Sequence, residues 1–147
     1  MISFGRLPHR GAVTILLVED NDADAERVER VLEQANMEHA LVRATDGMEA
    51  LEILRAPDGK VVKGPFILLV DLNMPRMDGL RFLQELRSDR KLRRAVVFVL
   101  TGSNLEDDKS AAYGFNVAGY LLKEKLDGLV PLMNCYSKLI NLPFMMH

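Results

Sequence analysis

The chain of 147 residues is 48% hydrophobic and 27% charged, the composition of one globular domain. Nineteen basic residues against 21 acidic ones give a net charge of −2 and no basic stripe, so no binding to nucleic acid is expected. A single cysteine, Cys135, excludes a disulfide framework and favours a cytoplasmic setting, while the lack of a signal peptide and of any apolar run near ~20 residues excludes a membrane partner.

Short apolar segments alternate with segments of helical periodicity along the chain. The apolar segments are rich in leucine and β-branched residues, and they predict strands at 13–18, 40–44, 66–70, 95–100 and 119–122. Helical spacing follows each strand, with an aspartate placed to cap four of the five helices: Asp22, Asp46, Asp78 and Asp127. Glu49, three residues after Asp46, suggests a capping box. The remaining helix is expected from about Asn104 to Tyr113.

This alternation predicts an α/β fold. Right-handed crossovers give a doubly wound five-stranded parallel sheet, in the flavodoxin-like order 2-1-3-4-5, with five helices. The domain is expected to span residues 12–140, with an N-terminal arm at 1–11, an exposed loop at 56–65 and a hydrophobic C-terminal tail at 141–147. Ligands of such sheets bind at the carboxyl ends of the strands, near the switch point between strands one and three.

Acidic residues stand at that switch point. Glu19 and Asp20 follow the first strand, and Asp71 follows the third. Converging carboxylates repel each other unless protons or a cation neutralise them, and hard oxygen ligands suit Mg²⁺. Strand-end acids also commonly cap loops, so spacing alone leaves both interpretations open.

Two further strand ends carry polar residues. Thr101 follows the fourth strand and Lys123 follows the fifth. Either residue alone would be interpreted as a turn residue or a solvated charge. Together with the acids, a hydroxyl and an ammonium make a site for a metal and a transferred phosphoryl group.

At these residues the sequence resembles the receiver domains of two-component response regulators. The matching segments are Ile-Leu-Leu-Val-Glu-Asp-Asn at 15–21, Val-Asp-Leu-Asn-Met-Pro-Arg-Met-Asp-Gly at 70–79, Leu-Thr-Gly at 100–102 and Gly-Tyr-Leu-Leu-Lys at 119–123. The resemblance implies that Asp71 accepts a phosphoryl group from a phosphohistidine of a separate histidine kinase. It further implies that Mg²⁺, with Mn²⁺ as a substitute, is held by Asp20, Asp71 and the backbone carbonyl of Asn73, with Glu19 acting through a metal-bound water.

The resemblance also assigns roles to the remaining site residues. Thr101 and Lys123 would neutralise and orient the phosphoryl oxygens, and Asn73 would tune hydrolysis of the aspartyl phosphate. Tyr120 matches the aromatic residue that is expected to switch together with Thr101. An ordinary half-buried tyrosine with its hydroxyl in water is the alternative for Tyr120.

The sequence departs from most receivers at one position and resembles one subgroup of them more closely. Glu124 follows Lys123 where most receivers have a proline after a cis peptide bond, so the geometry of this peptide is open. The long loop and the segment 134–143 are similar to stand-alone regulators that partner phytochrome-type histidine kinases.

The apolar residues of the C-terminal end favour a homodimer through helix four, strand five, helix five and the tail. These residues are Leu139, Ile140, Leu142, Phe144, Met145 and Met146.

The expected function is therefore that of a stand-alone receiver, which signals to an unidentified downstream protein through contacts or altered dimerisation. The only expected chemistry is autocatalytic phosphotransfer to its own aspartate and slow autodephosphorylation. A phosphatase of the haloacid-dehalogenase kind is an alternative, but it would need an aspartate where Asn73 stands. A flavodoxin-like module binding a flavin is another, although the acidic segment 19–22 would repel the flavin phosphate.

Overall fold

The computed structural model describes residues 3–6, 13–34, 39–56, 65–74, 77–102 and 106–140, with side chains described between 13 and 135. The strands are β1 (Ser3–Arg6), β2 (Val13–Val18), β3 (His39–Ala44), β4 (Phe66–Val70), β5 (Val96–Thr101) and β6 (Gly119–Leu122). The helices are α1 (Asp22–Leu32), α2 (Gly47–Leu54), α3 (Gly79–Ser88), α4 (Glu106–Gly114) and α5 (Leu129–Ile140), with a 3-10 helix, η1 (Lys123–Gly128), before α5.

The predicted parallel sheet is confirmed. Strands β2 to β6 are parallel and lie in the order β3-β2-β4-β5-β6, which is the order 2-1-3-4-5 of the sequence prediction. One strand was not predicted: β1 adds an antiparallel edge beside β3, with Ser3 opposite Arg43 and Phe4 opposite Val42. Ser-Phe-Gly-Arg is too short to show a period, and its glycine disfavours a strand, so only pairing with β3 makes the segment extended.

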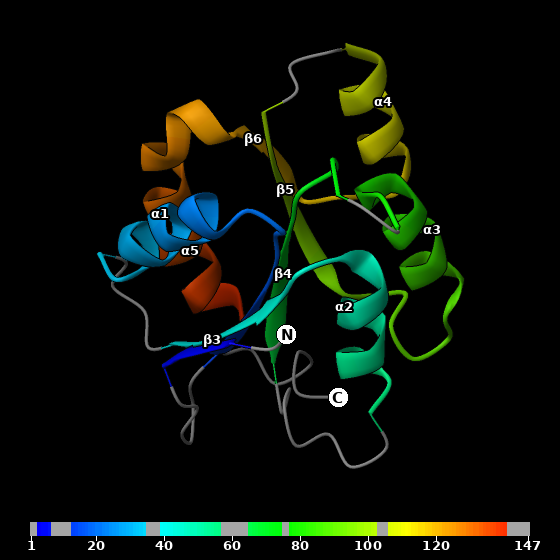
Figure 1. Ribbon diagram of the computed structural model, residues 1–147, viewed down its shortest axis with the longest axis horizontal. Helices are drawn as coiled ribbons and strands as arrows, with labels where there is room; N and C mark the ends of the chain where they lie inside the picture. Colours follow the sequence, from blue (N-terminus) through cyan, green and yellow to red (C-terminus); the bar gives the residue numbers. More distant parts are fainter. Residues whose placement is uncertain are drawn as a thin grey trace.

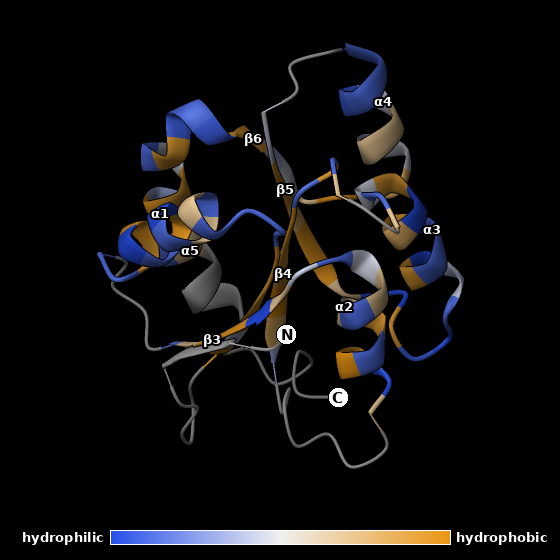
Figure 2. Ribbon diagram, viewed as in Figure 1, coloured by the Kyte–Doolittle hydropathy of each residue, from blue (hydrophilic) through white to orange (hydrophobic). Residues whose placement is uncertain are grey.

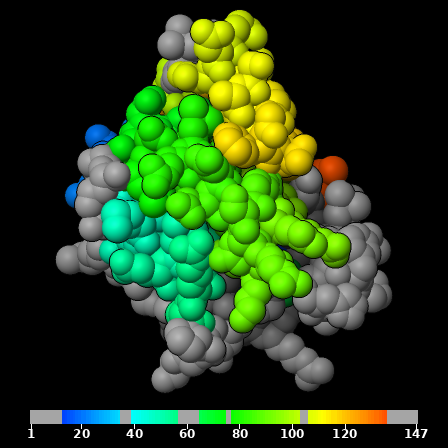
Figure 3. Space-filling view, turned by 90° about the vertical axis from the view of Figure 1, so that its right-hand side faces the viewer, coloured from blue at the N-terminus to red at the C-terminus, as the bar shows by residue number. Residues whose placement is uncertain are grey.

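Helices cover both faces of the sheet (Figure 1). Helices α1 and α5 lie on one face, and α2, α3 and α4 lie side by side on the other, as Figure 3 shows in space-filling form. Figure 2 shows the central strands as mostly hydrophobic, as expected for a sheet that is buried on both sides. Alternate residues of β2 enter opposite core clusters: Leu16 and Val18 face α2 and α3, whereas Ile15 and Leu17 face α1 and α5. Each such buried side chain stabilises the fold by roughly 1.5 to 3 kcal/mol.

The helix caps agree with the sequence prediction at two of four positions. The Asp46 side chain accepts a hydrogen bond from the Glu49 N–H, and that of Asp78 accepts one from the Arg81 N–H. The Glu49 side chain in turn accepts a hydrogen bond from the Thr45 N–H at 2.9 Å. The capping box is therefore present, but Glu49 bonds the residue before the cap and not the N–H of Asp46 itself.

The other two caps were predicted wrongly. Asn21, not Asp22, caps α1, because its side chain accepts from the Asp24 N–H while Asp22 lies in the first turn and pairs with Arg43. Asp127 lies inside η1 and does not begin α5, because the chain already turns helically at Lys123.

Several predictions fall outside the described residues. These are most of the loop at 56–65, the first residues expected for helix four, the tail at 141–147, and the apolar side chains from Leu139 to Met146. Among the described residues no peptide bond is cis, so the bond between Lys123 and Glu124 is trans. No helix in the described part of the chain is both long and apolar enough to span a membrane.

Candidate functional site

Three carboxylates meet at the carboxyl ends of β2 and β4. These strands are parallel neighbours with Val18 opposite Val70, so the residues that follow them, Glu19 and Asp71, emerge side by side. Both are buried, with 1% and 4% exposure, whereas Asp20 is exposed. One carboxylate oxygen from each of Glu19, Asp20 and Asp71 lies within 4.8 Å of the others, an arrangement that could hold a metal ion. The predicted convergence of these three acids is confirmed.

The Lys123 side chain lies across this cluster. Its Nζ is 2.8 Å from Glu19 Oε1 and 3.0 Å from Asp71 Oδ2. A third carboxylate, Asp24 Oδ2, lies 2.8 Å from the same nitrogen and comes from the first turn of α1. An ammonium has three N–H donors, so these three carboxylates can use all of its hydrogen-bonding capacity.

Burial and charge set the protonation of the cluster. Burial raises the pKa of Glu19 to about 7, and the Asp71 carboxylate adds to this, while hydrogen bonds from Lys123 and the Asn21 N–H act in the opposite direction. Burial also disfavours the charged Lys123, but its hydrogen bonds to Asp24, Glu19 and Asp71 outweigh burial and raise its pKa. The site therefore contains a firmly charged ammonium and more carboxylates than one cation neutralises. A divalent metal would offset most of the excess negative charge.

The turn after β4 is packed closely against the start of α3. The Asn73 N–H donates to Asp71 Oδ1 at 3.1 Å, and the Asn73 side chain is exposed. The Gly79 N–H donates to the Leu72 carbonyl at 2.8 Å. A Cβ at Gly79 would lie 2.5 Å from both the Asp71 carbonyl oxygen and the Leu72 Cα, too close for any other residue. Glycine here lets α3 begin directly against the backbone that carries Asp71.

The two remaining predicted site residues lie on the neighbouring strands. Thr101 is fully buried at the end of β5, next to β4 in the sheet. Tyr120, in β6, pairs with Val99 of β5, is half-buried, and packs against the core cluster that includes Val70 and Val99. Its ring centroid is 6.5 Å from that of Tyr113 on α4.

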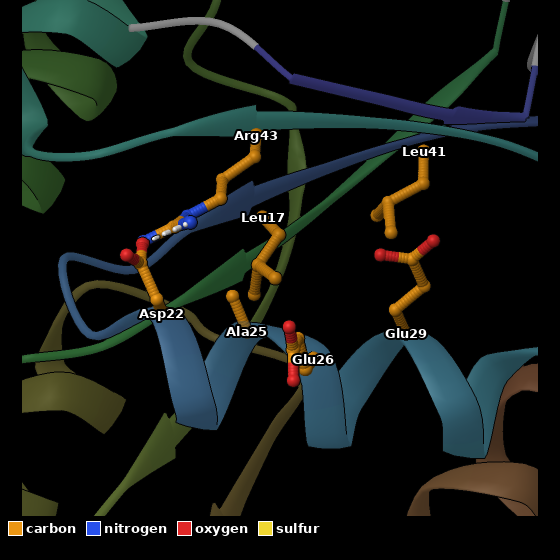
Figure 4. Close-up of a pocket in the computed structure, with 7 residues that line it drawn as sticks. All are labelled: Leu17, Asp22, Ala25, Glu26, Glu29, Leu41 and Arg43. Atoms are coloured by element: carbon orange, nitrogen blue, oxygen red, sulfur yellow. Dashed lines mark hydrogen bonds and ion pairs between the residues drawn. The ribbon is translucent and has the colours of Figure 1, made fainter.

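Two arginines that the sequence analysis did not single out hold the main chain of the site. Arg27 of α1 donates from Nη2 to the Lys123 carbonyl at 2.7 Å. Arg43 of β3 donates from Nε to the Glu19 carbonyl at 3.0 Å and from Nη1 to Asp22 at 2.7 Å. Figure 4 shows Arg43 extending from β3 to Asp22, along the pocket between α1 and β3.

Asp24 is the third site residue that was missed. The available signal was its spacing from Arg27, because residues three apart share one face of a helix. That spacing shows a shared face but not what the face contacts.

Comparisons with known proteins place this site in context. Residues 15–132 match the family model of the response regulator receiver domain. The chain is 39% identical to the response regulator Rcp1 of Synechocystis sp. over 113 residues, which are 76% of each chain. Among solved structures, it is similar to the Mn²⁺-bound form of Rcp1, with a TM-score of 0.76, 33% identity and coverage of 88% of this chain and 98% of that one. It is also similar to the phosphorylated cyanobacterial phytochrome response regulator RcpA, with a TM-score of 0.72, 33% identity and coverage of 86% and 92%.

Proposed function

This chain belongs to the response regulator receiver domain family, and we propose that it accepts the phosphoryl group of a histidine kinase on the carboxylate of Asp71. The observation that carries the proposal is the contact of 3.0 Å between Lys123 Nζ and Asp71 Oδ2, beside two further carboxylates that can hold a divalent ion. A weak nucleophile such as a carboxylate needs positioning and charge neutralisation for phosphoryl transfer, and this site supplies both.

In the proposed reaction an Asp71 carboxylate oxygen attacks the phosphorus of a phosphohistidine. The new O–P bond forms as the N–P bond breaks, and the kinase imidazole leaves with the bonding electron pair. Lys123 neutralises the incoming phosphoryl oxygens, and the Thr101 hydroxyl donates to one of them from the end of β5. Glu19, Asp20, Asp71 and the Asn73 backbone carbonyl would hold Mg²⁺, which supplies the remaining positive charge. The carboxylate oxygens within 4.8 Å of one another support this assignment.

We expect Asp71→Asn to abolish labelling, because an amide cannot form the aspartyl phosphate. The protein would be incubated with Mg²⁺ and acetyl phosphate, and the added mass measured on the intact chain. Asp89→Asn is the matched control, since Asp89 lies at the C-terminal end of α3, where its side chain pairs with Arg55. Labelling of Asp71→Asn at the parent rate would overturn the assignment.

We further propose that phosphorylation draws Thr101 toward the phosphoryl group and lets Tyr120 move into the space behind it. Their positions support this switch: Thr101 is buried one strand away from Asp71, and Tyr120 is only half-buried against the same core. Asn73, exposed two residues beyond Asp71, would set the rate of hydrolysis and keep autodephosphorylation slow.

For partners, we propose a phytochrome-type histidine kinase, an unidentified downstream protein and a second copy of this chain, all in the cytoplasm. The similarity to Rcp1 and RcpA supports the kinase class. Phosphotransfer profiling against the kinases of the host would test it. Sedimentation with and without beryllofluoride would test the homodimer, and a monomer under both conditions at high concentration would exclude it.

A further inference from the structure

The first turn of α1 contacts the Lys123 side chain in a way that the family assignment does not explain. Asp24 Oδ2 lies 2.8 Å from Lys123 Nζ, as close as Glu19 Oε1 and closer than Asp71 Oδ2. Yet the group of carboxylate oxygens that could hold a metal consists of Glu19, Asp20 and Asp71, without Asp24. Asp24 thus contacts the Lys123 ammonium but is not part of the group of carboxylates that could hold the metal.

We propose that Asp24 is a positioning residue, which retains the Lys123 ammonium beside Asp71 when a divalent cation takes over Glu19 and Asp71. This inference rests on the proposed function and adds a residue to its machinery. Without metal, Lys123 shares its three donors among Glu19, Asp24 and Asp71. A divalent cation competes for two of these carboxylates, and Asp24 is the one that it leaves to the lysine.

The two donors released in this exchange are then available to the phosphoryl oxygens on Asp71. Lysine has a flexible side chain of four methylene groups, so an ammonium without an anchor would lose its orientation. The Asp24 contact stays in place throughout, and its side chain is only 26% exposed, which limits screening by solvent.

The same helix also holds the backbone of Lys123. Arg27, one turn after Asp24, donates to the Lys123 carbonyl at 2.7 Å and lies 3.4 Å from Asp24 Oδ1. Helix α1 therefore fixes Lys123 at both ends, the ammonium through Asp24 and the main chain through Arg27.

Asp24 is not needed to begin its helix. The cap is made by the Asn21 side chain, which accepts from the backbone N–H of residue 24, a donor that remains after substitution. Its negative charge near the helix N-terminus is shared with Asp22, whose carboxylate pairs with Arg43. Asp22→Asn is therefore a matched control that removes one charge from the same turn without touching Lys123.

The test is a double-mutant cycle on Mg²⁺ affinity, measured by isothermal titration calorimetry. The four proteins are the parent, Asp24→Ala, Lys123→Met and the double variant. Asp24→Ala should weaken Mg²⁺ binding about three- to tenfold, because Lys123 then has only the metal ligands as partners. With Lys123→Met already present, the same change should have an effect of less than about twofold, since no ammonium competes.

Two further variants test whether hydrogen bonding or charge is responsible. Asp24→Asn retains an acceptor, so its affinity should lie between those of the parent and Asp24→Ala. Asp22→Asn should change affinity by less than about twofold. At saturating Mg²⁺, labelling by acetyl phosphate should be several-fold slower in Asp24→Ala and closer to the parent rate in Asp24→Asn.

Equal losses of Mg²⁺ affinity from Asp24→Ala with and without Lys123 would overturn the inference, because Asp24 would then act on the metal directly or through the fold. A loss of the same size in Asp22→Asn would also overturn it. Failure of the proposed function looks different: the parent would take no label at Asp71, while the Mg²⁺ cycle would still report on Asp24 and Lys123.

Discussion

Two cationic side chains lie at opposite ends of the sheet and are held in different ways. Lys123, at the carboxyl end, contacts three carboxylates. Arg87, in the last turn of α3, donates to four backbone carbonyls near the amino ends of β5 and β6: those of Arg93, Ala95, Phe115 and Asn116, at 2.7 to 3.2 Å. Burial lowers the pKa of Arg87, and its partners are neutral dipoles.

In the proposed function, this difference separates a structural cation, Arg87, from a functional one, Lys123. Carbonyls that are fixed in two loops can be satisfied by one rigid fork of donors, which ties the loops together. Carboxylates can exchange the ammonium for a metal or release it to a phosphoryl group. The same kind of charge therefore stabilises loops at one end of the sheet and, in the proposed function, takes part in chemistry at the other.

The largest expected effect is on phosphorylation when Lys123 is replaced. Lys123→Met should lower the rate of labelling by acetyl phosphate about 10²- to 10³-fold, the usual loss for a group that neutralises developing charge. Mg²⁺ should restore most of any stability lost, because it neutralises the same carboxylates. Rates from intact-mass measurements, with unfolding midpoints at several Mg²⁺ concentrations, would check this. If Lys123→Met were labelled within threefold of the parent rate, Lys123 would have no special role in labelling, and it would not differ from Arg87 in this respect.

Arg87 should show the opposite pattern. Arg87→Met should reduce the free energy of unfolding by about 2 kcal/mol, because several carbonyls lose their hydrogen-bond donor at once. Labelling of the folded protein should stay within about twofold of the parent, since the site lies at the other end of the strands. Urea unfolding measures the first quantity and the labelling rate the second. A large loss of rate in fully folded Arg87→Met would contradict the proposed separation.

The smallest effect concerns pH. Glu19, with a pKa of about 7, must lose its proton to favour a metal, so Mg²⁺ affinity should fall about tenfold between pH 8 and pH 6. Without metal, pH has the opposite effect on stability: the contribution of Glu19 to the free energy of unfolding falls as the pH rises. The raised pKa of Glu19 means that the folded state holds the proton more tightly, so this contribution is complete below pH 4.5 and is lost as the pH rises through about 7.

The pH prediction can be checked by calorimetric titration at several pH values. Glu19→Gln should flatten the pH dependence of Mg²⁺ affinity, while Arg87→Met should leave its slope unchanged, because carbonyls do not titrate in this range. An unchanged slope in Glu19→Gln would assign the proton to another group.

The sequence predicted those parts of the fold and site that follow from local pattern. Apolar runs located the five parallel strands, and the residues directly after them, Glu19, Asp71 and Lys123, were expected to converge because parallel strands share a carboxyl edge. Asp24 and Arg27 could not be found in this way. On a polar helix face they look like a solvated ion pair, and only the packing of α1 beside η1 brings them into contact with Lys123.

Contacts with distant parts of the chain also explain why the cap of α1 and the role of Arg87 were not predicted. Asn21 and Asp22 are both good capping residues, so sequence alone could not choose between them, and the pairing of Asp22 with Arg43 of a distant strand favours Asn21. Arg87 resembled any charged residue near the end of a helix, because its acceptors are backbone atoms that no side-chain pattern reveals.

The edge strand β1 has a consequence for the order in which the sheet forms and for the edge at which the chain enters it. Its paired neighbour in the sheet is β3, and β2, the next strand in the chain, pairs with the other side of β3. Ser3–Arg6 comes before β2 in the chain, yet it pairs with His39–Ala44, which follows β2, so this edge cannot form until β3 is available. Because β1 runs antiparallel to β3, it begins beside Arg43, whose guanidinium donates to the Glu19 carbonyl. A bulky fusion before Ser3 would therefore emerge at the carboxyl edge of the sheet, the edge that carries the carboxylate cluster.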